Sequence, residues 1–350
     1  MSFASKMSRG GVATLLLAIS VPTLAACSVL SDPGLIVHAL GEEGQRDIAV
    51  VRPDGTELQT VVNGPGDDFA PAWSPSRQRI AYLSDRDGNV ELYVSSADGA
   101  DTMRVTNTGV PESQPTWSPD GRRIAFTSPD QDGRPQVYWM SLSDLIPNRL
   151  QFGGESDTDP AWSPQGTWIA FASLDDEGNS QGLFLRNPDG VNQLRLSESA
   201  DRSPAWSPDG TKLAFVRGTC GAREGDGPGD DGSDIYVITV GEAGPIGQAQ
   251  QVTGNPACDF APEWSPDGKR LAFISDRNGD NDIFTVSDRG EDLRWLTRNE
   301  LQELAVRWGP DGRIVFESQP SGKSALFVMD VTGEQRLLTT SEAPSTQPDW

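Results

Sequence analysis

The chain has 350 residues, of which 37 are glycine and 26 are proline. This content of glycine and proline is typical of many short strands joined by tight turns, and it is too low for a low-complexity segment. Its 51 acidic and 28 basic residues give a formal net charge of -23, which would repel nucleic-acid phosphates and anionic lipid headgroups. We therefore expect no nucleic-acid partner. Attachment to a membrane would need something other than a basic surface.

The N-terminus has the features of an export signal. Lys6 and Arg9 precede an apolar run, Val12–Val21, that is too short to span a bilayer. The run ends in Leu-Ala-Ala-Cys at residues 24–27, which resembles the lipobox of bacterial lipoproteins. An ordinary signal peptide followed by a chance cysteine is the alternative. The resemblance predicts a lipoprotein signal peptide at residues 1–26.

The same resemblance implies that Cys27 becomes the acylated N-terminus of the mature protein. Residues 27–34 would then be the lipidated cysteine and a short tether, and residues 35–350 the folded body. The expected location is extracytoplasmic, with lipid on Cys27 anchoring the protein to a bacterial membrane. Inner and outer membrane both remain open.

A tryptophan motif recurs along the rest of the chain. Its full form is Pro-x-Trp-Ser-Pro-Asp-Gly, as at Pro115–Gly121 and Pro262–Gly268, and Val306–Gly312 is a degenerate copy. Successive motif tryptophans lie 44, 45, 44, 58, 44 and 42 residues apart, which is the period of propeller blades with one insertion. These tryptophans are Trp73, Trp117, Trp162, Trp206, Trp264, Trp308 and Trp350.

Each period contains four strand signals. In one unit, the Trp73 segment is followed by the apolar runs Ile80–Tyr82 and Leu92–Val94 and by a weaker strand that ends near Val105. Asp-Gly turns separate these runs. Because a lone four-stranded sheet would expose two apolar faces, the units must stack radially on one another. The repeats therefore predict an all-β propeller.

These repeats resemble the TolB-type family of WD40-like propeller repeats, over roughly residues 35 to 350. The resemblance is strong for the fold and weak for function, because propellers of this type serve many roles. The TolB pattern itself has an α/β domain before a six-bladed propeller. This chain departs from it, with about seven residues between Cys27 and the first strand signal.

The two ends of the chain complete one another. The N-terminal unit has signals for a second, a third and a fourth strand but none for a first, and these signals lie at residues 36–38, 47–50 and 61–62. At the other end, Ser345–Trp350 has the pattern of a first strand with nothing after it. Pairing the C-terminal strand with the N-terminal unit would add one blade to six full units. We expect seven blades, closed in this way.

Signals for catalysis are weak. The single histidine, His38, aligns with Tyr82 and Phe126 of other repeats and reads as a packed strand residue. Residues 178–182 fit the Gly-x-Ser-x-Gly string of hydrolases, but the string means little without a strand-turn-helix elbow and a partner histidine. We expect no catalytic residues and no cofactor, with the alternative of a propeller enzyme that cleaves glycans or peptides at the channel mouth.

Calcium is the one ion that the sequence leaves open. Asp276–Asp282 partly imitates a calcium loop, but its glycine is misplaced and turn chemistry explains it better. The insertion Gly218–Ser233 is rich in Gly and Asp and reads first as a surface loop. Because oxygen ligands on a pliable loop suit Ca²⁺, its acidic residues are candidate ligands. They are Asp226, Asp230 and Asp231.

The other two cysteines, Cys220 and Cys258, would be the remaining thiols in an oxidising compartment. In an up-and-down sheet, their two connections emerge on one face of the ring. We therefore predict a disulfide between them.

A carboxylate stands five residues before six of the seven motif tryptophans, and Ser345 takes this place before the seventh. If the tryptophan strand is innermost, these acids surround one mouth of the channel and attract a basic segment or a divalent cation. The alternative is that each carboxylate caps a turn. The six are Asp68, Glu112, Asp157, Asp201, Asp259 and Glu303.

The resulting hypothesis is a monomeric, lipid-anchored binding or scaffold propeller of the cell envelope. Its partner would be an envelope protein or a basic peptide segment, held at one face of the ring, and the chain would not be an enzyme.

Overall fold

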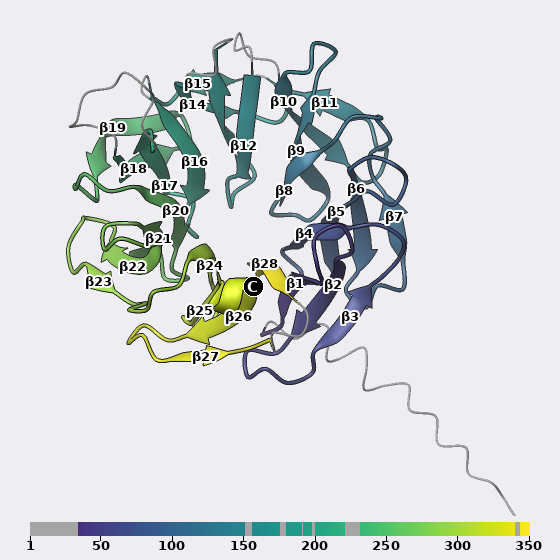
Figure 1. The fold of residues 1–350 in the computed structure, drawn as a ribbon. Helices are drawn as coiled ribbons and strands as arrows, with labels where there is room; N and C mark the ends of the chain where they lie inside the picture. Colours follow the sequence, from purple (N-terminus) through teal and green to yellow (C-terminus); the bar gives the residue numbers. More distant parts are fainter. Residues whose placement is uncertain are drawn as a thin grey trace, which may run out of the picture.

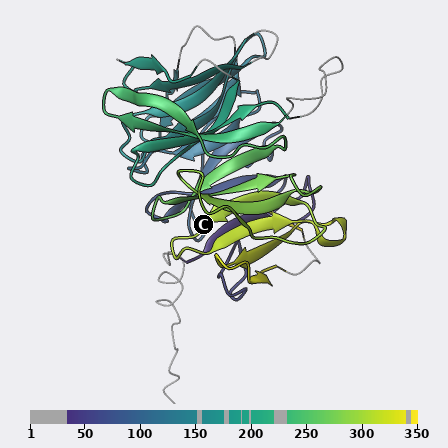
Figure 2. The same cartoon turned by 90° about the vertical axis from the view of Figure 1, so that its left-hand side faces the viewer.

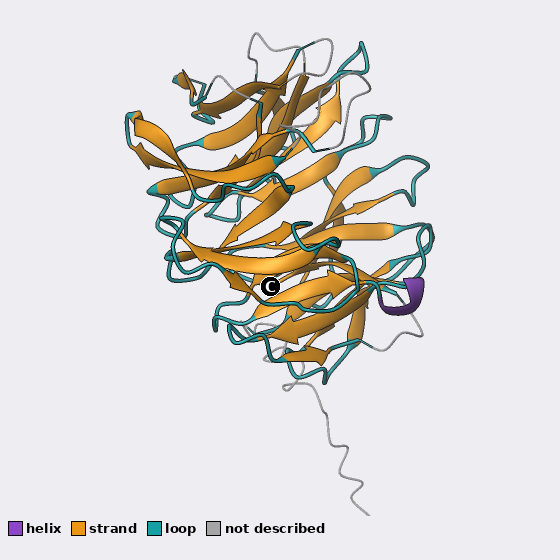
Figure 3. Cartoon of the chain, turned by 60° about the vertical axis from the view of Figure 1, so that its left-hand side comes forward, coloured by secondary structure: helices purple, strands orange, loops and turns teal. Residues whose placement is uncertain are grey.

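A computed structural model describes residues 34–150, 156–175, 180–190, 192–197, 200–220, 232–339 and 344–350. Seven four-stranded antiparallel sheets surround a central axis in this part of the chain, as Figure 1 shows. The only helix among the described residues is one short 3-10 turn, Pro320–Gly322 (Figure 3). The structure therefore confirms the predicted all-β propeller with seven blades.

Each blade has one strand nearest the centre and three strands that follow it outward. The innermost strands are β28 (Ser345–Asp349), β4 (Asp68–Trp73), β8 (Ser113–Trp117), β12 (Ser156–Trp162), β16 (Asp201–Trp206), β20 (Asp259–Trp264) and β24 (Glu303–Trp308). The second strands are β1 (Ile36–Leu40), β5 (Arg79–Ser84), β9 (Arg123–Pro129), β13 (Ile169–Leu174), β17 (Lys212–Gly218), β21 (Arg270–Ser275) and β25 (Ile314–Ser318).

The outermost strands are short, with two to four residues in every blade except one. The third strands are β2 (Asp47–Val51), β6 (Glu91–Ser96), β10 (Pro135–Ser141), β14 (Ser180–Arg186), β18 (Ser233–Gly241), β22 (Asp282–Ser287) and β26 (Ala325–Met329). The outermost strands are β3 (Gln59–Val62), β7 (Thr102–Arg104), β11 (Pro147–Arg149), β15 (Gln193–Arg195), β19 (Gly244–Gln251), β23 (Arg294–Trp295) and β27 (Gln335–Leu337).

The meander order places the connections alternately on two faces of the ring. Connections between second and third strands, such as β5–β6, lie on the same face as the start of every innermost strand. We call this side the hairpin face. The turns of the tryptophan motif, between first and second strands, lie on the opposite side, which we call the turn face.

The motif Trp-Ser-Pro-Asp-Gly forms a closed turn on the turn face. In the β8–β9 turn, the Ser118 hydroxyl accepts a hydrogen bond from the backbone N–H of Arg123 at 2.9 Å and donates one to the Asp120 carboxylate at 2.6 Å. Gly121 has φ +64°, a conformation that favours glycine. The motif recurs because each of its polar residues has a partner within the turn.

Both ends of the chain contribute strands to one blade. β28 pairs antiparallel with β1, with Ala39 opposite Thr346 and Leu40 opposite Ser345. In Figure 1 the C-terminus lies near the centre of the ring, beside the N-terminal blade. This pairing confirms the predicted composite blade and leaves no unpaired edge at the junction.

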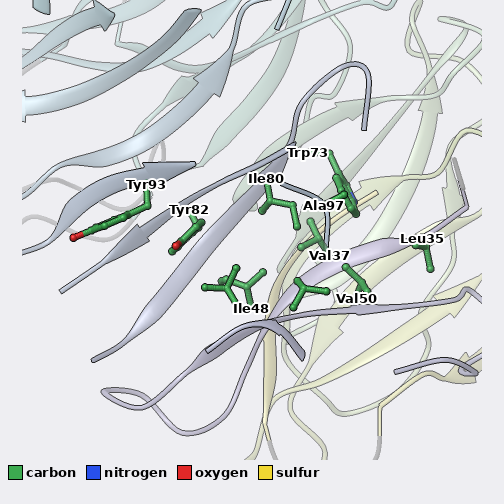
Figure 4. Close-up of a cluster of buried hydrophobic side chains, with 11 residues drawn as sticks. Leu35, Val37, Ile48, Val50, Trp73, Ile80, Tyr82, Tyr93 and Ala97 are labelled. Atoms are coloured by element: carbon green, nitrogen blue, oxygen red, sulfur yellow. The ribbon is translucent and has the colours of Figure 1, made fainter. Parts of the chain in front are cut away.

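Figure 2 shows the blades from the side, stacked against one another. Apolar side chains fill the space between neighbouring blades. In Figure 4, Val37 and Ile48 of the first blade pack with Trp73, Ile80 and Tyr82 of the second. All five side chains are buried. Burial of about 1.5–3 kcal/mol per large apolar side chain at each seam holds the blades together.

Several motif tryptophans also join neighbouring blades by a hydrogen bond. The indole N–H of Trp117 donates to the carbonyl of Ala72 in the preceding blade at 3.0 Å. Trp206 donates in the same way to Ala161, at 3.1 Å. A tryptophan at this position thus provides apolar area and an indole N–H that donates to the backbone of the preceding blade. These two contributions explain why tryptophan recurs in the repeat.

The hairpin face as a candidate binding site

The six carboxylates predicted at the channel mouth occupy equivalent positions, at or next to the start of each innermost strand on the hairpin face. Their side chains are buried, so they do not form the exposed ring of charge that we expected. The exposed fraction is 0% for five of them and 2% for Glu112. Burial forces each carboxylate either to find a partner or to hold a proton. The six differ in which of these occurs.

Three of the acids are paired with arginine. Both oxygens of Asp68 accept from Arg86 at 2.8 Å, and both oxygens of Asp259 accept from Arg277 at 2.8 and 2.9 Å. Asp201 accepts from Arg217 at 2.7 and 2.8 Å. These buried charge pairs are internal parts of their blades.

The arginines also lie over stacked aromatic rings. The Tyr82 and Tyr93 rings lie 5.7 Å apart, and the guanidinium of Arg86 is 5.0 Å from the centre of the Tyr93 ring. The guanidinium of Arg277 lies 4.7 Å from the ring of Phe284 in the same arrangement. The acid, the arginine and the ring pair therefore form one unit, stabilised by a charge-assisted hydrogen bond and by cation–π contact.

Three acids have no arginine or lysine bound to them among the described residues. Burial raises the pKa of Glu112 to about 7, although hydrogen bonds from Thr108 and Thr106 oppose the shift. Burial likewise raises the pKa of Asp157 to about 6 and that of Glu303 to about 7. A buried carboxylate without a cation keeps its proton more readily.

A cavity of about 630 Å³ opens beside one of these unpaired acids. It lies where the β7–β8 connection meets the β9–β10 hairpin, and Phe126 and Tyr138 form part of its lining. Thr108 and Ser128 also line it, and both donate hydrogen bonds to Glu112, at 2.7 and 3.2 Å. The cavity therefore combines an aromatic wall with hydroxyls that lead to a buried carboxylate.

The innermost strands carry a feature that sequence reasoning missed. The residue three before the motif tryptophan has positive φ in six of the seven strands. At three of these positions the side chain reaches the next blade: Gln347 accepts from the backbone of Ala70 at 2.8 Å, and Gln114 accepts from that of Asp159 at 3.1 Å. Asp159 in turn accepts from Ser203 at 3.1 Å. The left-handed bulge frees a backbone N–H for the neighbouring side chain.

The predicted disulfide is present on the hairpin face. Cys220 and Cys258 are bonded, with their Cα atoms 5.7 Å apart, and a hollow of about 570 Å³ adjoins them. The aspartates proposed as calcium ligands, Asp226, Asp230 and Asp231, lie outside the described residues, as do Cys27 and the signal segment. Their roles stay predictions.

The remaining candidates take structural roles. His38 is fully buried in β1, and burial lowers its pKa to about 4, which supports its interpretation as a packed strand residue. Ser180 is the first residue of β14, and its hydroxyl donates to the carbonyl of Asp201 at 3.0 Å, so the described part of the Gly-x-Ser-x-Gly string, residues 180–182, is strand and not the turn of a strand-turn-helix elbow. Gly178 lies outside the described residues.

The calcium-like segment Asp276–Asp282 forms the β21–β22 hairpin. The N–H of Gly279 donates to the carbonyl of Asp276, and the Asp276 carboxylate accepts from the backbone of Cys258 at 2.8 Å. Turn chemistry therefore accounts for Asp276. Within the described ranges, no three His, Cys, Asp or Glu side chains are arranged to hold a metal ion. The described part also has no helix of the length and apolarity that a membrane span requires.

Comparison with known proteins places the repeats in one family. The chain matches the TolB beta propeller domain over residues 35–224 and 177–350. It is 39% identical to the Tol-Pal system protein TolB of Syntrophus aciditrophicus over 62 residues. That segment is 18% of this chain and 14% of the relative, so the chain aligns with a small part of that protein's length.

Two solved structures illustrate the range of proteins with this fold. TolB from Acinetobacter baumannii aligns with 90% of this chain and 66% of its own, at 20% identity and a TM-score of 0.55. An oligogalacturonate lyase in complex with manganese aligns with 85% of this chain and 86% of its own, at 16% identity and a TM-score of 0.67. At these identities the likeness concerns the fold alone. The family match over the whole ring shows that the chain belongs to the TolB beta propeller domain family.

Proposed function

We propose that this protein is an extracytoplasmic, lipid-anchored binding propeller that holds an envelope protein on its hairpin face. The lipobox-like residues 24–27 support the anchor, and the net charge of -23 favours a partner with basic segments. The hairpin face also carries the disulfide and the two largest hollows described above. A closed ring braced in this way presents a preformed surface, which lowers the entropic cost of binding.

The observation that carries this proposal is the 630 Å³ cavity beside Glu112. Concave sites with aromatic walls and a few convergent polar groups are where proteins commonly bind ligands. The residues that a serine hydrolase would need are not together: Ser180 lies in β14, and His38 is buried in β1, two strands of different blades. The arrangement therefore favours binding over serine-dependent hydrolysis.

Site-specific photo-crosslinking in envelope preparations tests the proposal. A photoreactive residue at Asp132, which is exposed and lines the cavity, should capture one discrete protein partner. The matched control carries the same residue at Arg122, which is exposed in the β8–β9 turn on the turn face. Capture at Asp132 and not at Arg122 supports the proposal. Capture at Arg122 alone, or at neither position, contradicts it.

A further inference from the structure

The repeats show which group the cavity beside Glu112 lacks. Two blades carry a turn of matching sequence, Asp85–Gly88 (Asp-Arg-Asp-Gly) and Asp276–Gly279 (Asp-Arg-Asn-Gly), closed by a bond from the glycine N–H to the first carbonyl. The blade with the cavity has Asp130–Gly133, Asp-Gln-Asp-Gly, closed by the same bond at 3.0 Å. Gln131 has the place in the turn sequence that arginine has in the other two turns. Because β9 is one residue longer than β5, the residue that follows Ser128 by two, as Arg86 follows Ser84, is Asp130, so neither position has an arginine.

The arginine of the other turns makes three kinds of contact. Arg86 donates to both oxygens of the buried Asp68, and its Nε donates to the hydroxyl of Ser84 at 2.9 Å. Its guanidinium also lies over the stacked rings of Tyr82 and Tyr93. A guanidinium suits this place because it is planar, can pair with both oxygens of a carboxylate and stacks on aromatic faces.

The blade with the cavity keeps an equivalent of each partner of that guanidinium: Ser128 and the aromatic rings line the cavity, and Glu112 is hydrogen-bonded to its lining residues Thr108 and Ser128. Glu112 provides the buried carboxylate, and the rings of Phe126 and Tyr138 are stacked with their centres 5.9 Å apart. Ser128 takes the place of Ser84, and its hydroxyl donates to Glu112 at 3.2 Å. Among the described residues, no guanidinium lies over these two rings. Arg149 lines the cavity and pairs with Asp130 at 3.4 Å.

We propose that this cavity binds the guanidinium of an arginine side chain from a protein partner, which takes the position that Arg86 and Arg277 occupy in their own blades. The Glu112 carboxylate and the Ser128 hydroxyl accept its N–H groups, and the rings of Phe126 and Tyr138 receive its face. The proposal rests on the proposed function, because it takes the arginine to come from the partner held on the hairpin face.

The burial of Glu112 supports this assignment. Its exposed fraction is 2%, and an isolated buried carboxylate is costly unless it is protonated or paired with a cation. Burial has raised its pKa to about 7, so the acid gains a counter-charge when a guanidinium arrives. A lysine ammonium would satisfy the charge but could not stack or pair in the same planar geometry.

The first test measures binding of Nα-acetyl-arginine amide to the purified full-length protein in detergent, by calorimetry. We expect saturable binding to the wild type, and binding of the corresponding lysine amide that is about tenfold weaker or more. Glu112→Gln removes the charge and should weaken arginine-amide binding about tenfold or more. Equal binding of the arginine and lysine amides, or no effect of Glu112→Gln, overturns the proposal.

The second test fills the cavity from within. Gln131 lines the cavity, so Gln131→Arg places a guanidinium at its wall and should abolish arginine-amide binding. The control, Gln335→Arg, adds the same side chain on the exposed strand β27 and should leave binding unchanged. A reciprocal variant, Arg86→Gln, should lower the melting temperature, and millimolar methylguanidinium should restore part of it while sodium chloride does not. Undiminished binding by Gln131→Arg, or absence of rescue in Arg86→Gln, counts against the proposal.

Crosslinking at Asp132 separates this inference from the proposed function. Partner capture that is lost when Gln131→Arg is added, and kept with Gln335→Arg, supports an arginine from the partner. Partner capture that survives Gln131→Arg leaves the proposed function in place and refutes the arginine pocket. Arginine-amide binding without any captured partner shows instead that the cavity takes a free guanidinium compound, and the proposed function then fails.

Discussion

The indole ring of Trp350 lies directly against the backbone of Gly309. A Cβ atom added to Gly309 would come within 2.5 Å of Cδ2 and Cε3 of that ring, closer than carbon atoms can approach. The five preceding copies of the motif have serine at this place, and the copy before the ring closure has glycine. The motif is therefore degenerate at the point where the C-terminal tryptophan must fit.

Gly309→Ala should destabilise the ring by about 1–3 kcal/mol, the usual cost of overpacking a well-packed site. Gly309 does not have a positive φ, so the alanine tests the contact and not backbone strain. Urea unfolding measures the effect. In a double-mutant cycle, Trp350→Phe should relieve part of the cost of Gly309→Ala because the smaller ring leaves space. Additive effects of the two substitutions would show that the contact is not tight.

Deleting Ser345–Trp350 should lower the melting temperature of the whole protein. The deletion removes β28, which pairs with β1, and exposes the apolar cluster that includes Ile36 and Leu326. Loss of the buried tryptophan alone is expected to cost about 3–5 kcal/mol. Leu337→Ser, on the exposed strand β27, is the control and should change the transition little. An unchanged transition after the deletion would mean that β28 does not close the ring.

Much of the fold could be predicted because its signals are local and repeated. The spacing from Trp73 to Trp350 and the complementary ends of the chain were enough to indicate seven blades. The burial of the acids was not predicted. Asp68 and Arg86 are 18 residues apart, as are Asp259 and Arg277, and this repeated spacing is the signal that would have revealed the pairs.

The sequence contains no comparable pattern for the residues of the innermost strands that have positive φ. The six positions are occupied by Ala70, Gln114, Asp159, Ser203, Ala261 and Gln347. These residue types do not share a preference for positive φ, so the conformation belongs to the β-bulge between the first and second strands and not to local propensity. The cavity beside Glu112 was also missed, because the absence of an arginine from one hairpin becomes meaningful only when its surroundings are seen in three dimensions.

Acylation at Cys27 is expected from the lipobox-like residues before it. Cys27→Ala should abolish fatty-acid labelling in cells and move the protein from the membrane fraction to the soluble fraction, because the anchor is lost. Cys220→Ala with Cys258→Ala is the control, since it removes cysteines without touching the lipobox and should keep the label. Labelling that persists in Cys27→Ala would exclude this cysteine as the acylation site.

Removing the disulfide should lower the free energy of unfolding. Cys220 and Cys258 are 38 residues apart, and a closed loop of this size contributes about 3 to 4 kcal/mol in the chain-entropy account. The double variant with serine at both positions should therefore unfold at lower urea concentration than the wild type. A reductant should destabilise the wild type to a similar extent and leave the variant unaffected. Two free thiols in the denatured, unreduced wild type would refute the bond.

Glu303 should make the free energy of unfolding fall as the pH rises from about 4.5 to 7. Burial raises its pKa from 4.5 to about 7, despite a hydrogen bond from Asn299, and the carboxylate of Asp282 adds to the rise. Between these values the folded state binds a proton that the unfolded state has released, so Glu303 reduces the free energy of unfolding increasingly from about pH 4.5 to 7.

Glu303→Gln is neutral at every pH and should therefore be more stable than the wild type at pH values above this window. The free energy of unfolding of Glu303→Gln relative to the wild type should be about 1–3 kcal/mol higher at pH 8 than at pH 5, at about 1.4 kcal/mol per pKa unit.

Glu91→Gln is the matched control. Hydrogen bonds from Asn89, Arg104 and the backbone N–H of Gly109 outweigh burial and lower the pKa of Glu91 to about 2, so its carboxylate stays ionised in the folded state. Glu91→Gln should destabilise the protein by nearly the same amount at both pH values. If Glu303→Gln also shifts the urea midpoint equally at pH 5 and pH 8, Glu303 does not titrate in this window.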